Sequence, residues 1–262
     1  MTILENIKLQ KLKEVAERKV LRPQQLLEKS MYFETQCVSL SKYLKNPQHS
    51  GIIAEFKRSS PSRGSINPYA DVEKVTIGYM QAGAAALSVL TDELFFGAKA
   101  ADLPIARKYN YCPILRKDFI IDEYQIIESK AMGADAILII AKMLPSADIA
   151  AFTNLAQSLG MEVLLEANTE REIFENYHTE ADLVGINNRD LNTFEVNMKN
   201  SIRLAKMLPE NIVKVAESGI QSVAVINELK NNGFSGFLIG EYFMKYSNPS
   251  VKCEELVKQL GL

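Results

Sequence analysis

The feature that most constrains the fold of this chain is a short apolar segment that recurs eight times. The segments are rich in β-branched residues and begin roughly 20 to 35 residues apart, the size of a unit of one strand and one helix. They are Gly51–Lys57, Ala85–Thr91, Cys112–Lys117, Ala136–Ala141, Glu162–Glu166, Leu183–Asn187, Ile212–Glu217 and Gly236–Gly240. Segments this apolar are typical of parallel strands that are buried on both faces.

Amphipathic stretches between these segments predict helices. Asp71–Gln81, Ser146–Leu159 and Gln221–Asn231 place apolar residues at helical spacing among polar ones. Glycine tolerates the left-handed conformation that often ends a helix. Glycines stand after a helical stretch and before a strand at Gly83, Gly133, Gly160 and Gly233. Their shared place in the unit indicates one repeating architecture.

Eight strands that alternate with helices predict an α/β fold, a (β/α)8 TIM barrel, with an open doubly wound sheet as the alternative. Against the open sheet, no GxGxxG motif follows the first strand. The length of 262 residues also suits one barrel. Before the first strand, apolar residues recur at helical spacing at Leu4, Ile7, Leu12 and Val15. We therefore expect a single TIM-barrel domain over 1–262, with an N-terminal helical extension at 1–50 that can cover part of the barrel at 51–262.

Composition argues against several classes of function. The net charge of −2 has no basic excess, and no basic patch or stripe suggests a nucleic-acid partner. The longest apolar run is too short to cross a bilayer, and the N-terminus lacks the apolar core of a signal peptide. The cysteines Cys37, Cys112 and Cys253 are far apart, and neither a CxxC motif nor a Cys/His cluster suggests a metal. We expect a cytosolic protein with no membrane partner.

Charged and polar residues stand at the ends of the predicted strands, where barrel active sites lie. Glu55 and Lys57 share one face of the first strand, because side chains alternate along a strand. An unpaired charge inside a strand is costly, so this pair favours a functional site over a purely structural buried pair. Other strand ends carry Arg116-Lys117-Asp118, Glu166, Asn187-Asn188-Arg189 and Glu217-Ser218-Gly219. Any one of these ends, taken alone, is better explained by a strand that leaves the core into solvent.

The last two strands predict a phosphate site. Ser218-Gly219 and Gly240-Glu241 follow strands seven and eight, whose loops frequently bind phosphate in such barrels. Glycine allows close approach of the backbone, and Glu241–Lys245 can form a short helix whose N-terminus faces an anion. The residues therefore favour acid–base chemistry on a small phosphorylated molecule.

The segment Ile52–Ser62, IIAEFKRSSPS, resembles the signature of the indole-3-glycerol-phosphate synthase family. The N-terminal ILENI and KLKEVAERK also resemble this family, so the resemblance covers essentially the whole chain. Later stretches fit in order and spacing: SVLTDELFFG (88–97), PILRKDFIID (113–122), GADAILII (133–140), LLEA (164–167), GINNRDLNTFEV (185–196), AESGI (216–220) and FLIGEYFM (237–244). The first-strand signature and INNRDL are specific to the family, whereas GADAILII is generic to barrels.

The resemblance implies a carboxy-lyase of tryptophan biosynthesis. This family closes the pyrrole ring of 1-(2-carboxyphenylamino)-1-deoxyribulose 5-phosphate, releases CO2 and water, and needs neither cofactor nor metal. The implied partner is thus a small phosphorylated substrate, and association with other enzymes of the pathway stays open.

The resemblance also assigns catalytic roles. It makes Lys117 the general acid that protonates the substrate carbonyl oxygen. Arg116 would lower the pKa of Lys117 and Asp118 would oppose that shift, so its direction stays open. Lys57 pairs with the substrate carboxylate and can donate a proton during dehydration. Glu166 is the base for the dehydration step.

Further residues orient the substrate by the same resemblance. Glu55 and Asn187 orient it, and Glu55 favours positive charge on the anilino nitrogen. Arg189 acts by charge near the substrate, and Glu217 and Ser218 support the site from the seventh strand. The phosphate-binding positions are Ser60, Gly219, Gly240 and Glu241, the last through its backbone N–H. Phe96 and Leu138 match positions that line the anthranilate ring pocket, although the residues alone suggest ordinary core.

Two positions depart from the family pattern. Lys142 follows the fourth strand where a small or neutral residue is expected, and it either adds positive charge at the mouth or is simply solvated. Ala167-Asn168 replaces a more usual pair such as Val-His after Glu166. We expect neither position to carry the chemistry.

Two other functions remain as alternatives. One is another phosphosugar barrel enzyme, either an isomerase of the same pathway or a lyase that forms a Schiff base through a lysine. The other is a barrel that binds a phosphorylated ligand or a partner without catalysis. Such a protein is expected to lose the lysines or Glu166 while keeping Gly219 and Gly240, and here both sets are present.

Overall fold

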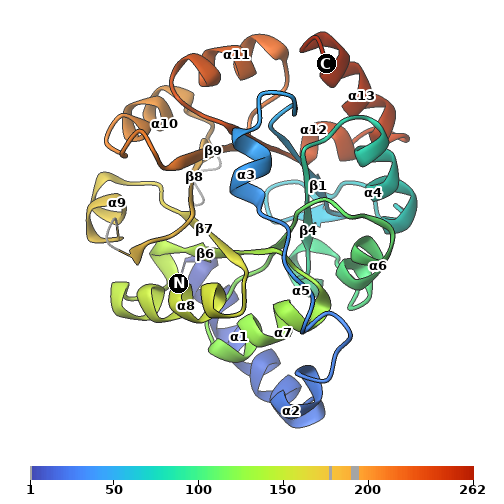
Figure 1. Cartoon of the computed structure of the whole chain (residues 1–262), viewed down its shortest axis with the longest axis vertical. Helices are drawn as coiled ribbons and strands as arrows, with labels where there is room; N and C mark the ends of the chain where they lie inside the picture. The colour runs from blue at the N-terminus through green and yellow to red at the C-terminus, as the bar shows by residue number, and fades with distance from the viewer. Residues whose placement is uncertain (1, 177–178, 190–194) are drawn as a thin grey trace.

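The computed structural model describes residues 2–176, 179–189 and 195–262. Within these ranges, eight parallel strands close into a barrel, and strands that follow one another in sequence lie side by side (Figure 1). They are β1 (Ile52–Phe56), β4 (Ala86–Leu90), β5 (Ile114–Lys117), β6 (Ala136–Ile140), β7 (Glu162–Glu166), β8 (Leu183–Asn187), β9 (Val213–Glu217) and β10 (Gly236–Ile239). A short antiparallel hairpin, β2 (Ser59–Ser60) and β3 (Gly64–Ser65), follows β1.

The barrel prediction is confirmed, because each of the eight predicted segments contains one of these strands. The open doubly wound sheet is ruled out by the pairing of the first strand. β1 pairs with β4 on one side and with β10 on the other, so the sheet closes on itself.

Helices surround the barrel (Figure 1). The extension holds α1 (Ile3–Leu21), α2 (Gln24–Leu27) and α3 (Leu40–Lys45). Around the barrel follow α4 (Val72–Gln81), α5 (Glu93–Phe96), α6 (Asp102–Tyr109), α7 (Glu123–Met132), η1 (Ala141–Met143), α8 (Ser146–Ser158), α9 (Glu170–Asn176), α10 (Met198–Ala205), α11 (Val223–Asn231), α12 (Glu241–Met244) and α13 (Pro249–Gln259). None of the helices in the described ranges is both long enough and apolar enough to cross a membrane.

The predicted helix boundaries are close to the observed ones, and their differences have a local cause. Asp71 and Ser222 stand just outside α4 and α11, because their side chains accept hydrogen bonds from the backbone of the first turn. The four repeated glycines adopt φ values of +88°, +88°, +80° and +85°. This left-handed conformation confirms that they end the helices before the next strands.

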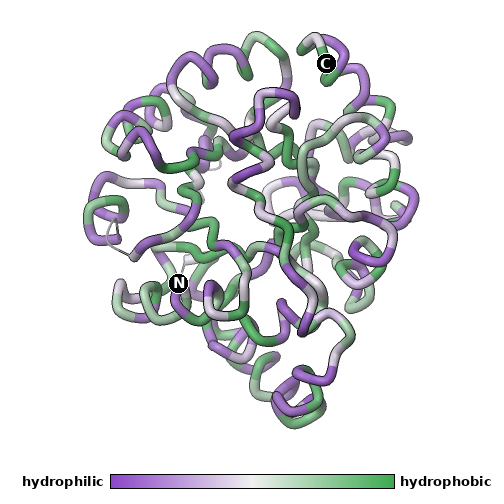
Figure 2. The backbone as a smooth tube through the Cα atoms, in the orientation of Figure 1, coloured by the Kyte–Doolittle hydropathy of each residue, from purple (hydrophilic) through white to green (hydrophobic). Residues whose placement is uncertain are grey.

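The apolar core has two layers, separated by the strands. Side chains such as Leu115 and Leu164 point into the barrel, whereas Ile114 and Val163 point outward against the helices. Figure 2 shows the hydrophobic strands in the middle and frequent hydrophilic residues on the surrounding helices. The alternation of side chains along each strand decides which residues reach the inside of the barrel.

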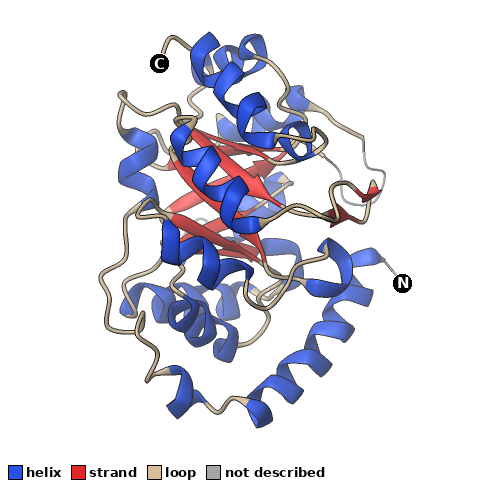
Figure 3. Cartoon of the chain, turned by 90° about the vertical axis from the view of Figure 1, so that its right-hand side faces the viewer, coloured by secondary structure: helices blue, strands red, loops and turns tan. Residues whose placement is uncertain are grey.

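The N-terminal extension covers both ends of the barrel. Ile3, Leu4 and Ile7 of α1 line the pocket at the C-terminal ends of the strands. Leu44 of α3 lies against Gly236, at the opposite end where β10 begins. Figure 3 shows the long helix α1 running beside the barrel from the side that carries the β2–β3 hairpin.

The prediction that Leu12 belongs to the apolar face of α1 is wrong. Leu12 is 51% exposed, whereas its neighbour Lys11 is only 1% exposed. The face turns toward Lys11 because its ammonium group forms ion pairs with Asp92 and Asp118 of the barrel.

Candidate active site

A single pocket at the C-terminal ends of the strands gathers all the residues that the sequence assigns to the site. Charged members come from β1, β5, β7 and β9 and from the loops that follow β8 and β10. The predicted residues that line it are Glu55, Lys57, Ser60, Phe96, Lys117, Leu138, Glu166, Asn187, Arg189, Glu217, Ser218, Gly219, Gly240 and Glu241. The closed parallel topology explains this convergence, since all strand ends of one kind meet at one rim.

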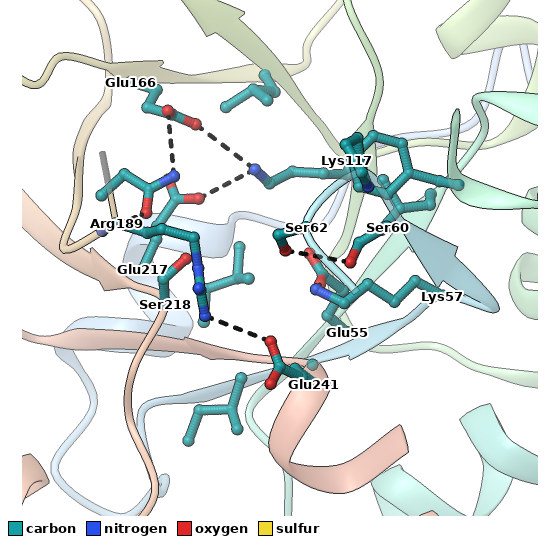
Figure 4. A pocket seen from close by; sticks show the side chains of 18 of the residues that line it. Glu55, Lys57, Ser60, Ser62, Lys117, Glu166, Arg189, Glu217, Ser218 and Glu241 are labelled. Atoms are coloured by element: carbon teal, nitrogen blue, oxygen red, sulfur yellow. Dashed lines mark hydrogen bonds and ion pairs between the residues drawn. The ribbon is translucent and has the colours of Figure 1, made fainter. Parts of the chain in front are cut away.

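Lys117, the last residue of β5, points across the pocket toward two carboxylates (Figure 4). Its Nζ lies 3.0 Å from Oε2 of Glu217 and 3.6 Å from Oε2 of Glu166. All three side chains are largely buried, with exposed fractions of 14%, 2% and 3%. The ammonium group is therefore held between two acids in a site with little water.

The pKa of Lys117 is raised above its ordinary value of 10.5. Burial works to lower it, but the negative charges of Glu217, Glu166 and Glu55 more than offset that effect. Lys117 is thus protonated at neutral pH, the form that a proton donor needs.

The two sequence neighbours of Lys117 are bound to other partners: Arg116 faces away from the pocket, and Asp118 lies at its border. Arg116 donates hydrogen bonds to Glu128 and to Ser129 of α7, on the outside of the barrel. Asp118 accepts from Arg116 and forms an ion pair with Lys11. The main groups that raise the pKa of Lys117 are Glu217, Glu166 and Glu55 rather than its sequence neighbours, so the direction that the sequence left open is upward. The reason is strand alternation, which turns adjacent side chains to opposite faces.

Glu217 has an unusual environment for a carboxylate. Burial, together with the nearby carboxylates of Glu166 and Glu55, raises its pKa to about 7, although Lys117 opposes the shift. Its second oxygen, Oε1, is buried and has no hydrogen-bond partner among the described residues. Gly185 of β8 leaves it room, since a Cβ atom at that position would collide with this oxygen.

Glu55 and Lys57 form a second charged pair, which comes from the end of β1 and lines the same pocket as Lys117 (Figure 4). Lys57 Nζ lies 2.5 Å from Oε1 of Glu55, and the side chains are 16% and 4% exposed. The prediction that they share one face of the first strand is confirmed. Gly240 lies directly beside Glu55, and a Cβ atom there would come within 3.0 Å of the Cβ and Cδ atoms of Glu55.

Asn168 contacts the site, although it was not among the predicted site residues. Its Nδ2 donates to Oε1 of Glu166 at 3.2 Å, and its Oδ1 accepts from the backbone N–H of Asn187 at 3.0 Å. Asn187 in turn reaches the same oxygen of Glu166 at 3.4 Å. Asn168 thus forms hydrogen bonds with two predicted site residues, and the expectation that it does not itself carry the chemistry stays a prediction. The available signal was its place two residues beyond Glu166, on the same face of an extended chain.

The loops after β9 and β10 form the other end of the pocket. Ser218 and Gly219 have φ values of +65° and +71°, and Asn188 holds the turn by donating to the carbonyl of Ser218 at 2.7 Å. The predicted short helix is confirmed as α12, which begins at Glu241. This combination of a tight turn and a helix N-terminus directs backbone N–H groups toward an anion.

The side chain of Glu241 is directed away from that backbone. Its carboxylate pairs with Arg63 at 2.9 Å and with Arg189 at 3.3 Å (Figure 4). These two cations offset the negative charge of Glu241 at the start of α12.

Phe96 and Leu138 line an apolar part of the same pocket, together with Ile3, Leu4 and Ile7 of α1. The ring of Phe96 lies 6.0 Å from that of Phe119, measured between centroids. The residues are therefore placed to contact a planar ring, and α1 completes the apolar wall.

Remaining predictions concern the rim and metals. Lys142 is exposed in η1 and does not line the pocket. Residues 190–194 of the INNRDL stretch lie outside the described residues. Within the described ranges, no group of three or more His, Cys, Asp or Glu side chains is arranged to hold a metal ion.

Comparison with known proteins adds the family. The sequence model described as "Indole-3-glycerol phosphate synthase" matches residues 4–256. A protein of that name from Bacteroides thetaiotaomicron is 47% identical over 211 residues, which cover 80% of this chain and 81% of the relative. Another from Caldanaerobacter subterraneus subsp. tengcongensis is 38% identical over 262 residues, 98% of each chain.

Solved structures share the fold at low identity. Thiamine phosphate pyrophosphorylase from Pyrococcus furiosus superposes with a TM-score of 0.61 at 16% identity, covering 85% of this chain and 99% of that one. The 3-hexulose-6-phosphate synthase from Salmonella typhimurium gives a TM-score of 0.60 at 12% identity, covering 79% and 98%. At these identities the likeness shows the barrel alone.

Proposed function

Because the chain belongs to the indole-3-glycerol phosphate synthase family, we propose that it closes the pyrrole ring of 1-(2-carboxyphenylamino)-1-deoxyribulose 5-phosphate. The reaction releases CO2 and water and makes the protein a carboxy-lyase of tryptophan biosynthesis. One observation carries the proposal: two lysines, each beside buried carboxylates, line one pocket that also has a phosphate-type turn and an apolar wall.

Ring closure is the first step. The ring carbon that bears the carboxylate attacks the ribulose carbonyl carbon, and a new carbon–carbon bond forms. The carbonyl oxygen takes a proton from the ammonium group of Lys117 as negative charge develops on it. The raised pKa of Lys117 supports this role, because the proton is present before the reaction starts. Glu217 and Glu166 hold the ammonium group in place.

Decarboxylation follows. The bond between the ring carbon and the carboxylate breaks, CO2 leaves, and the electron pair restores the aromatic ring. Lys57 binds this carboxylate before it leaves, and its pairing with Glu55 supports that assignment because Glu55 fixes the direction of the ammonium group. Phe96 and Leu138 hold the ring itself against the apolar wall.

Dehydration completes the reaction. The hydroxyl group formed from the carbonyl leaves as water with a proton from Lys57, while the anilino nitrogen supplies electrons and becomes positive. The carboxylate of Glu55, which lies next to Lys57, stabilises the positive charge on the anilino nitrogen. Glu166 then removes a proton from the adjacent carbon, and the double bond of the pyrrole ring forms. Asn168 and Asn187 orient Glu166 for this step.

The phosphate anchors the substrate at the far end. Backbone N–H groups at Gly219, Gly240 and Glu241 bind it, with the hydroxyl of Ser60. Arg189 adds positive charge from the β8 end, and Ser218 supports the turn. This grip fixes the distance from the phosphate to the two lysines.

The wider setting belongs to the same proposal. Residues 1–50 and the barrel at 51–262 act as one domain, because Ile3, Leu4 and Ile7 complete the pocket. The protein works in the cytosol, since its three cysteines are unpaired, as is usual in a reducing compartment.

The direct test is formation of indole-glycerol phosphate, followed by absorbance, when purified protein is mixed with the carboxyphenylamino ribulose phosphate. We expect turnover without added metal or cofactor and no covalent adduct when borohydride is present. A borohydride-trapped adduct at Lys117 without indole product would instead favour a Schiff-base lyase. Tight binding measured by calorimetry with no product would favour a barrel that only binds a ligand.

A further inference from the structure

The most deeply buried lysine of the described chain lies outside the catalytic pair, in the N-terminal helix α1. Lys11 is 1% exposed, and its Nζ lies 2.8 Å from Asp92 Oδ2 and 2.9 Å from Asp118 Oδ1. Both aspartate side chains are fully buried. A third carboxylate, Glu14 of the same helix, lies 3.0 Å away at the edge of the cluster. One ammonium group thus joins α1 to two separate segments of the barrel.

The first segment is the end of β5, which carries Lys117, the proposed proton donor. Asp118 follows Lys117 directly and is held on every side. Its Oδ2 accepts from Thr91 at 2.6 Å and from Arg116 at 2.9 Å, and its Oδ1 accepts from the N–H of Phe119 at 2.8 Å. The end of β5 is therefore fixed through Asp118, and Lys11 ties that fixed point to α1.

The second segment is α5, which carries Phe96 of the apolar wall. Asp92 caps α5 by accepting from the backbone N–H of Phe95 at 2.6 Å, and α5 ends with Phe96. The other oxygen of Asp92, Oδ2, has no hydrogen-bond partner among the described residues besides its ion pair with Lys11. The orientation of α5, and with it the ring of Phe96, depends on that ion pair.

We propose that Lys11 is a positioning residue that sets the distance between the proton donor Lys117 and the ring-binding residue Phe96. It does so by holding Asp118 and Asp92, one at the base of each residue, with a single ammonium group. The inference rests on the proposed function, since it assigns to Lys117 and Phe96 the parts that they play there. It gives the N-terminal extension a role in the geometry of the reaction beyond covering the pocket.

The charges of the cluster agree with this role. Burial works to lower the pKa of Lys11, but Asp118 and Asp92 offset it and raise the pKa above its ordinary value. Conversely, Lys11 and Arg116 hold the pKa of Asp118 well below its ordinary value, although burial opposes them. Without Lys11, the two buried carboxylates would lack their common partner and would repel each other, which would disturb the side chains at the ends of both segments.

The test compares Lys11→Met with Lys19→Met. Lys19 lies on the same helix and pairs with Asp122 at 2.8 Å, but this pair is exposed and distant from the pocket. The readouts are kcat, KM, and the inhibition constants of anthranilate and of inorganic phosphate. We expect Lys11→Met to lower kcat and to weaken anthranilate binding by about tenfold or more, with phosphate binding unchanged. Lys19→Met should match the wild type in all four values.

Asp92→Asn tests one arm separately and guards against poor folding of Lys11→Met. Asparagine caps a helix as well as aspartate, so α5 keeps its cap, but the ion pair with Lys11 is lost. We expect weaker anthranilate binding by about tenfold and a smaller loss in kcat than in Lys11→Met. Equal losses in anthranilate and phosphate binding, or unchanged anthranilate binding in both variants, would overturn the inference. Failure of the proposed function is a different result, because the wild type itself would then form no indole product.

Discussion

The ammonium group of Lys117 lies 3.0 Å from Glu217, a carboxylate that is almost fully buried. Each group changes the protonation of the other. Lys117 keeps its proton because Glu217 is near, and the pKa of Glu217 would rise further above about 7 without Lys117. The proposed acid and the group that steadies it are therefore one coupled unit.

Lys117→Met should remove the proton donor while leaving the barrel folded. We expect kcat to fall by about a hundredfold or more, because general acid catalysis contributes that much at a well-placed site. The absorbance assay measures the loss, and thermal unfolding checks that the fold remains. Lys142→Met is the matched control, since Lys142 is an exposed lysine at the same rim. A Lys117→Met protein with the wild-type rate would contradict the assigned mechanism.

The raised pKa of Glu217 predicts a pH dependence of stability. Between pH 4.5, the ordinary value for this group, and about 7, the folded protein holds a proton that the unfolded chain has released. Folding is therefore favoured by this group at low pH, and its contribution is lost as the pH rises through about 7. We expect the unfolding temperature of the wild type, relative to Glu217→Gln, to fall from pH 5 to pH 8, a range that includes the folded-state pKa of about 7.

Glu217→Gln removes this titrating group, and the groups that do not contact Glu217 contribute equally in both proteins. The measurement is a series of thermal unfolding curves at matched ionic strength. A difference between the two proteins that increases with pH would have the opposite sign and would show that the pKa of Glu217 is lowered instead.

Asn168 should matter more than its place outside the family pattern suggests. In Asn168→Ala, Glu166 loses a hydrogen-bond donor at 3.2 Å, and the backbone of Asn187 loses its acceptor. We expect kcat to fall by about tenfold with little change in phosphate binding, since the phosphate end is remote from both contacts. Steady-state kinetics with inorganic phosphate as a competitive inhibitor measures kcat and phosphate binding separately. Equal loss of both would mean that the whole rim has moved.

Much of this site follows from the sequence because strands impose their own geometry. Glu55 and Lys57 share a face by alternation, and the closed topology brings Glu166 and Glu217 to the same rim. The same alternation explains the failure to predict the environment of Lys117, because Arg116 and Asp118 count as neighbours only in the sequence. The roles of the site residues stay predictions.

Contacts between distant segments could not be predicted from local patterns. Lys11 reads as a solvated residue of an amphipathic helix, yet it is buried because Asp92 and Asp118 meet it from two other parts of the chain. Leu12 was expected in the apolar face and is exposed for the same reason. A single chain shows the spacing of residues along a helix but not which partner determines the rotation of that helix.

Gly240→Ala should disrupt the ion pair between Glu55 and Lys57 rather than the fold. A Cβ atom at Gly240 would come within 3.0 Å of the Cβ and Cδ atoms of Glu55 and would collide with its carboxylate. Glu55 lines the pocket beside Gly240, so we expect its carboxylate to shift away from Lys57 and break their 2.5 Å contact.

We expect Gly240→Ala to lower kcat by about tenfold or more, because Lys57 loses the group that directs it toward the substrate. Weaker phosphate binding should accompany this, since the same glycine borders the anion site. Gly160→Ala is the control: it lies in a turn with φ of +80° and open space around it, so it strains the backbone without touching the pocket. If both alanine variants keep wild-type kcat and differ only in unfolding temperature, Glu55 does not direct Lys57.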